Sequence, residues 1–195
     1  MAPDILRQIN ALAVLGIVGL LAFAFLDQFL LSDLPCPLCI LQRVGFLLAG
    51  FGFALNVVFG CRPAHYGIAI LGALAGAAVS ARQVMLHIAP GTGSYGEPLF
   101  GLHFYTWAFI AFVAIIAGAA VLLLVERQFA RTEPSAPHNG RGPTPTFGKV
   151  AVGLFGLMAL ANALSTFAEC GLGLCPDDPT RYELLEGEPD GAADQ

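Results

Sequence analysis

The sequence predicts an all-α membrane protein with five transmembrane helices, and three observations support this fold class. Of the 195 residues, 56% are hydrophobic and only 12% are charged, whereas a soluble domain carries about 25% charged residues. Five separate apolar stretches each approach the roughly 20 residues that a helix needs to cross the bilayer. None of them alternates with the two-residue period of a membrane β-strand. A soluble enzyme is therefore excluded.

The first expected span covers residues 9–31. Asp27 and Gln28 interrupt it near its end. Its apolar run is long for a signal peptide, and no small-x-small cleavage site follows it. We therefore expect a retained transmembrane helix.

The second and third expected spans cover residues 39–59 and 64–88. Each carries polar side chains close to one end, namely Gln42, Arg43, Arg82 and His87. Charged residues inside a membrane span are costly and most often serve a function. These side chains are therefore candidates for a site, although Arg43 can also be read as an anchor that extends its charge to the headgroups.

The fourth and fifth expected spans cover residues 102–125 and 150–168. The fourth is apolar throughout after Trp107, and the fifth contains Asn162. The intervening residues, 126–149, are rich in Pro and Gly and predict a flexible linker.

Basic residues predict the orientation, because cytoplasmic loops carry an excess of Lys and Arg. With five spans, one side of the membrane holds Arg7, Arg62, Arg127, Arg131, Arg141 and Lys149. The tail on the other side is acidic and holds Asp177, Asp178, Glu183, Glu186, Glu188, Asp190 and Asp194. We therefore expect a cytoplasmic N-terminus and an external C-terminus.

The five cysteines divide between the two sides in a chemically sensible way. Cys36 and Cys39 follow the first span, and Cys170 and Cys175 follow the fifth, so both close pairs are expected outside. Cys61 follows the second span and is expected in the cytoplasm. Disulfides persist on the oxidising outer side. Because the basic residues alone predict the orientation, the distribution of the cysteines supports it independently.

Cys36 and Cys39 form a C-x-x-C motif at the start of the second span. A helix N-terminus favours the thiolate, which is the reactive form of cysteine. Arg43 lies four residues after Cys39 and therefore one turn deeper on the same helix face. Its guanidinium favours negative charge on the cysteine or on a bound electron acceptor. Two alternatives stay open, namely a static disulfide and a zinc site completed by the second pair.

Cys170 and Cys175 enclose four residues that include two glycines. This spacing is typical of a pliable loop, and a flexible disulfide can meet a partner and then return to its own membrane. A purely structural disulfide fits the spacing equally well.

The stretch LPCPLCILQR at residues 34–43 resembles the signature of the disulfide bond formation protein B (DsbB) family. ARQV at residues 81–84 and GLHFYTW at residues 101–107 also resemble this family. The resemblance implies a four-helix transmembrane bundle over residues 1–125. A linker over 126–149 and a fifth transmembrane helix with an external cysteine-containing tail over 150–195 complete the expected organisation.

The resemblance also implies a function. Members of the family reoxidise a periplasmic thioredoxin-fold oxidase (DsbA-like). They pass the electrons to a quinone, either ubiquinone or menaquinone, in the inner membrane. The implied catalytic cysteines are Cys36 and Cys39, with Cys39 meeting the quinone beside Arg43. The loop at 89–101 lacks the family's usual second pair, so we infer that Cys170 and Cys175 replace it. Arg82 and His87, at the depth of Arg43, are further candidates for quinone binding.

Two other functions remain as alternatives, a quinone reductase of the vitamin K epoxide type and a zinc-binding membrane assembly factor. No metal is expected for the favoured function. Nucleic acid is excluded as a partner, because nine Lys and Arg against 14 Asp and Glu give a net charge of −5 and no basic surface. We expect membrane lipid to surround the helices.

Overall fold

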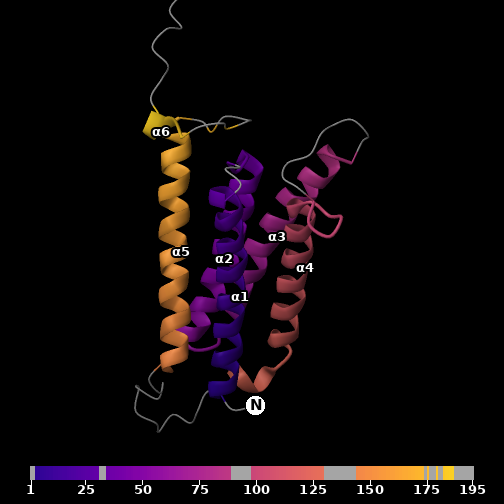
Figure 1. Ribbon diagram of the computed structural model, residues 1–195. Helices are drawn as coiled ribbons and strands as arrows, with labels where there is room; N and C mark the ends of the chain where they lie inside the picture. The colour runs from indigo at the N-terminus through magenta and orange to yellow at the C-terminus, as the bar shows by residue number, and fades with distance from the viewer. Residues whose placement is uncertain are drawn as a thin grey trace, which may run out of the picture.

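A computed structural model describes residues 3–30, 34–88, 98–129, 144–173, 175, 179 and 182–186. Its long helices stand side by side (Figure 1). The elements are α1 (Pro3–Leu30), α2 (Pro37–Phe59), α3 (Pro63–Leu86), α4 (Phe104–Leu123), the 3₁₀ helix η1 (Glu126–Phe129), α5 (Thr146–Cys170) and α6 (Glu183–Glu186). The described residues form no strand beyond one isolated bridge between Leu99 and Leu102.

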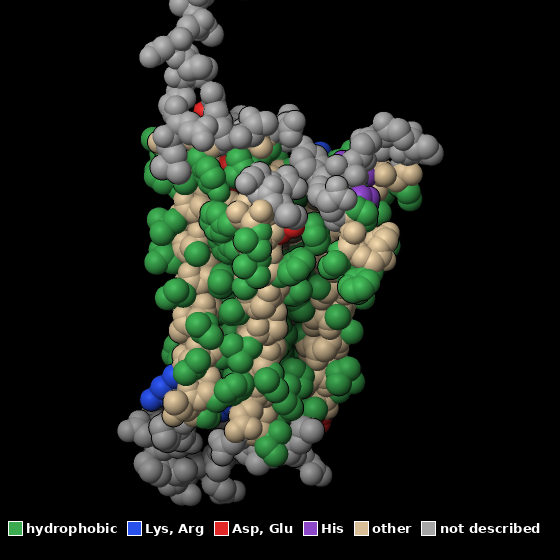
Figure 2. Space-filling view, viewed as in Figure 1, with side chains coloured by type: hydrophobic (Ala, Val, Ile, Leu, Met, Phe, Trp, Pro, Cys, Tyr) green, Lys and Arg blue, Asp and Glu red, His purple; other side chains and the backbone are tan. Residues whose placement is uncertain are grey.

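All five long helices are long and apolar enough to span a membrane, which confirms the predicted fold class. Hydrophobic side chains cover much of the face of the bundle that Figure 2 shows. Every long helix exposes large apolar residues, for example Leu12, Phe51, Leu71, Val121 and Leu157. A soluble monomer rarely exposes so continuous an apolar surface. The chain is therefore a multi-pass membrane protein with five candidate spans.

α1 and α5 begin well before the apolar stretches that predicted them. α1 starts at Pro3 rather than residue 9, and α5 starts at Thr146 rather than residue 150. Arg7 is buried because its guanidinium donates to the Val57 carbonyl oxygen at 2.8 Å and to Thr144 Oγ1 at 3.1 Å. A polar side chain that has protein partners lets a helix continue beyond its apolar window. Residues 130–143 of the expected linker lie outside the described residues.

The helices pack in a spatial order that differs from their order in the chain. α2 makes its largest interface with α3, and α3 makes its next largest with α4. α1 packs against α2 and α5, so that α5 lies at the edge of the bundle away from α4 (Figure 1). The fifth helix is therefore joined to the bundle through α1 and α2.

Small residues let α2 and α3 approach closely. A Cβ atom at Gly72 would lie 2.7 Å from the Ala49 nitrogen and 2.7 Å from the Leu48 Cβ atom, and a Cβ atom at Gly45 would lie 2.7 Å from the Gly76 Cα atom. Close backbone approach at small residues is a common way for membrane helices to associate. The interface therefore has no room for a side chain at these positions.

We expect Gly72→Ala to destabilise the bundle by about 1–3 kcal/mol, because α2 and α3 must separate to admit the methyl group. Unfolding of the purified protein in mixed detergent micelles measures this difference. Gly67→Ala is the matched control, since a Cβ atom at Gly67 of the same helix meets nothing within 4 Å. Equal stability of the two variants would contradict the packing described above.

A buried polar cluster lies at the end of the bundle that holds the start of α1. Asn10 donates to the hydroxyl of Tyr66 at 2.8 Å, and Asn56 donates to Asn10 Oδ1 at 2.9 Å. Cys61 borders this cluster and is the free cysteine of the chain. Burial raises the pKa of the Cys61 thiol above its ordinary value, which keeps it in the less reactive thiol form.

Candidate active site

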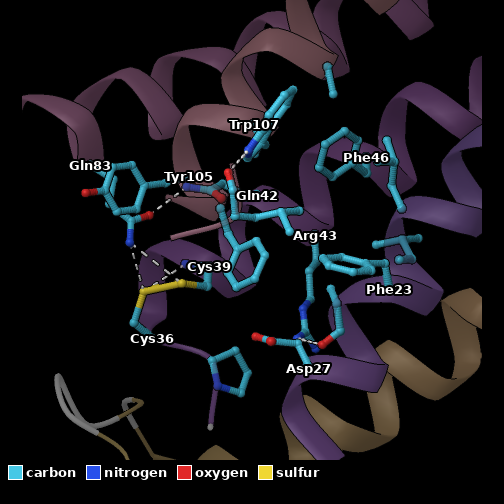
Figure 3. A pocket seen from close by; sticks show the side chains of 18 of the residues that line it. Phe23, Asp27, Cys36, Cys39, Gln42, Arg43, Phe46, Gln83, Tyr105 and Trp107 are labelled. Carbon is cyan, nitrogen blue, oxygen red and sulfur yellow. Dashed lines mark hydrogen bonds between the residues drawn. A yellow bond between two sulfur atoms is a disulfide. The ribbon is translucent and has the colours of Figure 1, made fainter. Parts of the chain in front are cut away.

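The opposite end of the bundle contains a pocket of about 440 Å³ (Figure 3). Helices α1, α2 and α4 form most of its wall, and Gln83 of α3 completes it. Most of its surface is apolar and comes from residues that include Leu20, Leu21, Phe104, Ala108, Ile110 and Ala111. Its volume is within the range of about 300–1,000 Å³ typical of small-molecule sites.

Cys36 and Cys39 lie in the wall of this pocket and form a disulfide. Pro37 opens α2, where a proline is tolerated because the first helical N–H groups have no intrahelical acceptor. Cys36 is the N-cap, and its sulfur accepts a hydrogen bond from the Cys39 N–H at 3.2 Å. Cys36 is buried and Cys39 is half-buried. Both sulfurs thus lie at the positive end of a helix dipole.

Two glutamines form a chain that ends at the disulfide. Gln42 donates from Nε2 to Gln83 Oε1 at 2.7 Å. Gln83 in turn directs its own Nε2 at Cys36 Sγ, 3.4 Å away, and at Cys39 Sγ, 3.7 Å away (Figure 3). Both glutamines are buried. An amide donor directed at sulfur stabilises a thiolate there after reduction.

Arg43 lies in the same pocket wall as the disulfide, as its spacing from Cys39 predicts. Its Nη1 donates to Gln28 Oε1 at 2.8 Å, and its Nη2 donates to the Ala24 carbonyl oxygen at 3.1 Å. The guanidinium also lies 5.0 Å from the centre of the Phe25 ring. α1 therefore fixes the position of the Arg43 side chain.

Arg82 and His87, which were expected near Arg43, are not among the described residues that line this pocket. Successive residues of an α-helix are about 100° apart, so Gln83 faces inward while Arg82 is exposed. His87 ends α3, where its Nδ1 lies 2.8 Å from the Gln83 carbonyl oxygen and its ring stacks on Tyr105 at 5.4 Å. Gln83 and Tyr105 occupy the wall in their place.

Cys170 and Cys175 form a second disulfide at the end of α5. This pair does not line the first pocket. It borders a separate hollow between α2 and α5, together with Ile40 and Arg43. Arg43 therefore borders both hollows, with one disulfide in each.

The two disulfides do not favour the zinc alternative. Their four sulfurs are bonded in pairs, whereas zinc binds free thiolates. In the described part of the chain, no three His, Cys, Asp or Glu side chains gather in a group that holds a metal.

Known proteins resemble this chain over the residues that form the first pocket's disulfide. The family model for disulfide bond formation protein DsbB matches residues 6–95, which include the first disulfide and Arg43. A Xanthomonas campestris protein named disulfide bond formation protein B is 36% identical over 114 residues, which are 55% of this chain and 66% of the relative. The chain belongs to the DsbB family.

Two other relatives with that name define the extent of the similarity. The Hahella chejuensis protein is 40% identical over 90 residues, 43% of this chain and 53% of the relative. The Nitrosomonas eutropha protein is 40% identical over 85 residues, 42% of this chain and 52% of the relative. The DsbB-family chain thus spans about half the length of these curated relatives. No solved structure gives a significant match.

DsbB is a family of disulfide-forming oxidoreductases, and this member has two cysteine pairs. The family match covers α1, α2 and α3. The second pair lies outside the matched residues, on a helix that packs against the matched ones.

Proposed function

We propose that the chain is a protein-dithiol:quinone oxidoreductase, which reoxidises a DsbA-like periplasmic partner and passes the electrons to ubiquinone or menaquinone. One observation carries the proposal: the Cys36–Cys39 disulfide and the Arg43 guanidinium lie in the wall of one apolar pocket. A disulfide in such surroundings has a place for an apolar electron acceptor next to its sulfurs.

The pocket residues fit a quinone. Its apolar side chains suit the ring and the start of an isoprenoid tail, and Arg43 provides donors for a carbonyl oxygen. Two hydrogen bonds to α1 use part of the Arg43 fork, and its remaining N–H groups donate no further hydrogen bond among the described residues. When bound, the quinone takes up the two electrons and two protons that a dithiol loses as it becomes a disulfide.

The chain's own residues then have separate tasks. Cys39, one turn from Arg43, is the sulfur that we assign to the acceptor, and Cys36 is the sulfur that exchanges with the second pair. Gln83 and the α2 dipole stabilise the thiolate that exchange requires. Arg43 orients the acceptor and stabilises negative charge as it develops.

Cys170 and Cys175 are proposed to receive electrons from the partner. A partner thiolate attacks this disulfide, and the partner leaves as a disulfide while Cys170 and Cys175 become thiols. One of these, as a thiolate, then attacks Cys36, which restores the second disulfide and reduces the first. Gly171, which ends α5 with a positive φ of 59°, lets the chain turn sharply after Cys170. This turn is the point at which we expect the pair to move.

The distribution of charge supports an inner-membrane protein with a cytoplasmic N-terminus and both disulfides in the periplasm. The ends of α1 and α5 that hold Arg7 and Lys149 lie opposite the end that holds α6 (Figure 1). We further propose that α1–α4 form the functional core, and that α5 adds the second disulfide to it.

A membrane-impermeant thiol reagent tests this orientation. Applied from outside to reduced spheroplasts, it should label Cys170 and Cys175. Ala64→Cys, an exposed position next to Cys61, should remain unlabelled until the membrane is opened. Labelling of Ala64→Cys from outside would contradict the proposed orientation.

Purified protein tests the function itself. Given quinone and a reduced thioredoxin-fold oxidase without oxygen, it should form one partner disulfide for each quinone reduced. Partner oxidation that proceeds equally without quinone would refute the proposal.

A further inference from the structure

Glu169 is a fully buried carboxyl group in the last turn of α5, next to Cys170. Neither of its oxygens has a hydrogen-bond partner in the described part of the chain. Burying an ionisable group without a partner costs several kcal/mol in free energy, and such groups are rare unless they serve a function. Packing of α5 alone gives no reason for a carboxyl group at this position.

Among the described residues, Arg43 carries the positive charge that acts on Glu169 electrostatically. Arg43 therefore forms part of the pocket wall and also interacts electrostatically with a carboxyl group of α5. A Glu169 carboxylate and the Arg43 guanidinium carry opposite charges, so the carboxylate offsets part of the positive charge that Arg43 presents to the pocket.

Gln28 links α5 to Arg43 by a second route. Its Nε2 donates to Ser165 Oγ at 3.0 Å and to the Tyr182 hydroxyl at 2.9 Å. Because both of its N–H groups point to these oxygens, its Oε1 is left to accept from Arg43. The fifth helix and the residue before α6 thus determine which atom of Gln28 faces the guanidinium.

Other charged or titratable groups around this cluster come from each neighbouring element. Asp27 of α1 and Tyr182 act on Arg43 electrostatically. Glu183 opens α6, which packs against the same end of α5. In the oxidised protein the adjacent Cys170 is in a disulfide and does not titrate. Glu169 is the member that is fully buried without a hydrogen bond.

We propose that Glu169 is a positioning residue of the quinone site, which acts through Arg43 and sets the net charge presented to the ligand by losing or gaining a proton. As a carboxylate it offsets the guanidinium, and as an acid it leaves the full positive charge for an electron-rich ligand. This inference rests on the proposed quinone site and adds α5 to it.

Equilibrium binding to the oxidised protein tests the inference without turnover. The chain's single tryptophan, Trp107, lines the pocket, so its fluorescence reports occupancy. Two ligands of nearly equal shape are compared: 1,4-naphthoquinone, which is neutral, and 2-hydroxy-1,4-naphthoquinone, which is an anion at neutral pH. Glu169→Gln removes the charge and keeps the shape. It should bind the anion at least about fivefold more tightly than the wild type and the neutral quinone equally well.

Three comparisons keep the test decisive. Glu126→Gln, at the opposite end of the bundle, should leave both affinities unchanged. Glu169→Asp keeps the charge and should resemble the wild type. In the wild type, affinity for the anion should fall as rising pH ionises Glu169, while affinity for the neutral quinone stays level.

Each failure has its own meaning. If Glu169→Gln folds and binds the anion no more tightly than the wild type, the role of Glu169 is refuted. If Glu169→Gln does not fold, the wild type decides: equal pH dependence of its affinities for the two ligands refutes the role. If neither ligand quenches Trp107 in the wild type, the quinone site itself is refuted.

Discussion

Arg43→Ala should lower the efficiency of quinone reduction by at least about tenfold while the protein stays folded. Loss of a charged hydrogen bond typically costs about 1.5–3 kcal/mol, and Arg43 is the cation in the pocket wall that holds the disulfide. The rate of quinone reduction with a small dithiol as electron donor measures this effect, since such a donor bypasses the protein partner.

Two further variants sharpen the result. Arg43→Lys should recover only part of the efficiency, because Lys lacks the planar fork that bonds to Gln28 and Ala24. Arg82→Ala is the matched control, since Arg82 is an exposed arginine outside the pocket. If Arg43→Ala behaves like Arg82→Ala, Arg43 is an anchor and the site lies elsewhere.

The double variant Cys170→Ser/Cys175→Ser should lose at least about 90% of its oxidation of the protein partner, because thiol–disulfide exchange requires an accessible disulfide for the partner thiolate. Cys36 is only 3% exposed, so the partner has no direct access to it in this structure. The variant should still reduce quinone when a small dithiol supplies the electrons. Partner oxidation and dithiol-driven quinone reduction are measured side by side.

Cys61→Ser is the matched control, because Cys61 lies at the other end of the bundle and is free. It should behave as the wild type in both assays. A stable cross-link between the two pairs, trapped when one cysteine of each is replaced, would identify the exchange intermediate. Normal partner oxidation by the double variant would show that the second disulfide is only structural.

The sequence alone predicted the fold class because transmembrane helices are encoded locally. Each apolar stretch corresponds to one helix of the structure. The boundaries were less accurate, since α1 extends over residues whose polar side chains find partners far away in the chain. Arg7, which bonds to Val57, is one example.

The candidate site was predictable where residues are close in sequence and not where they are distant. The turn of helix between Cys39 and Arg43 placed both in one wall. The sequence did not predict which face of α3 turns inward, because small residues such as Gly72 and Ala73 do not mark one face clearly. Arg82 rather than Gln83 was therefore the expected site residue. A glutamine beside an arginine in an apolar span was the signal available in the sequence.

Glu169 was missed for a related reason. Its burial depends on α5 packing against α1 and α2, which no local pattern encodes. Its only distinction in the sequence is a carboxyl group directly before Cys170. Most of the acidic tail, including Asp177, Asp178 and residues 187–195, lies outside the described residues.

The central claim is that Cys36 and Cys39 pass electrons to a quinone in their own pocket. The most direct measurement uses the Cys170→Ser/Cys175→Ser variant, reduced and freed of reductant without oxygen, and then given one equivalent of quinone. Mass spectrometry of the thiols and the absorbance of the quinone are followed together. We predict that one Cys36–Cys39 disulfide forms for each quinone reduced. Quinone that stays oxidised, or is reduced while Cys36 and Cys39 remain thiols, would contradict the claim.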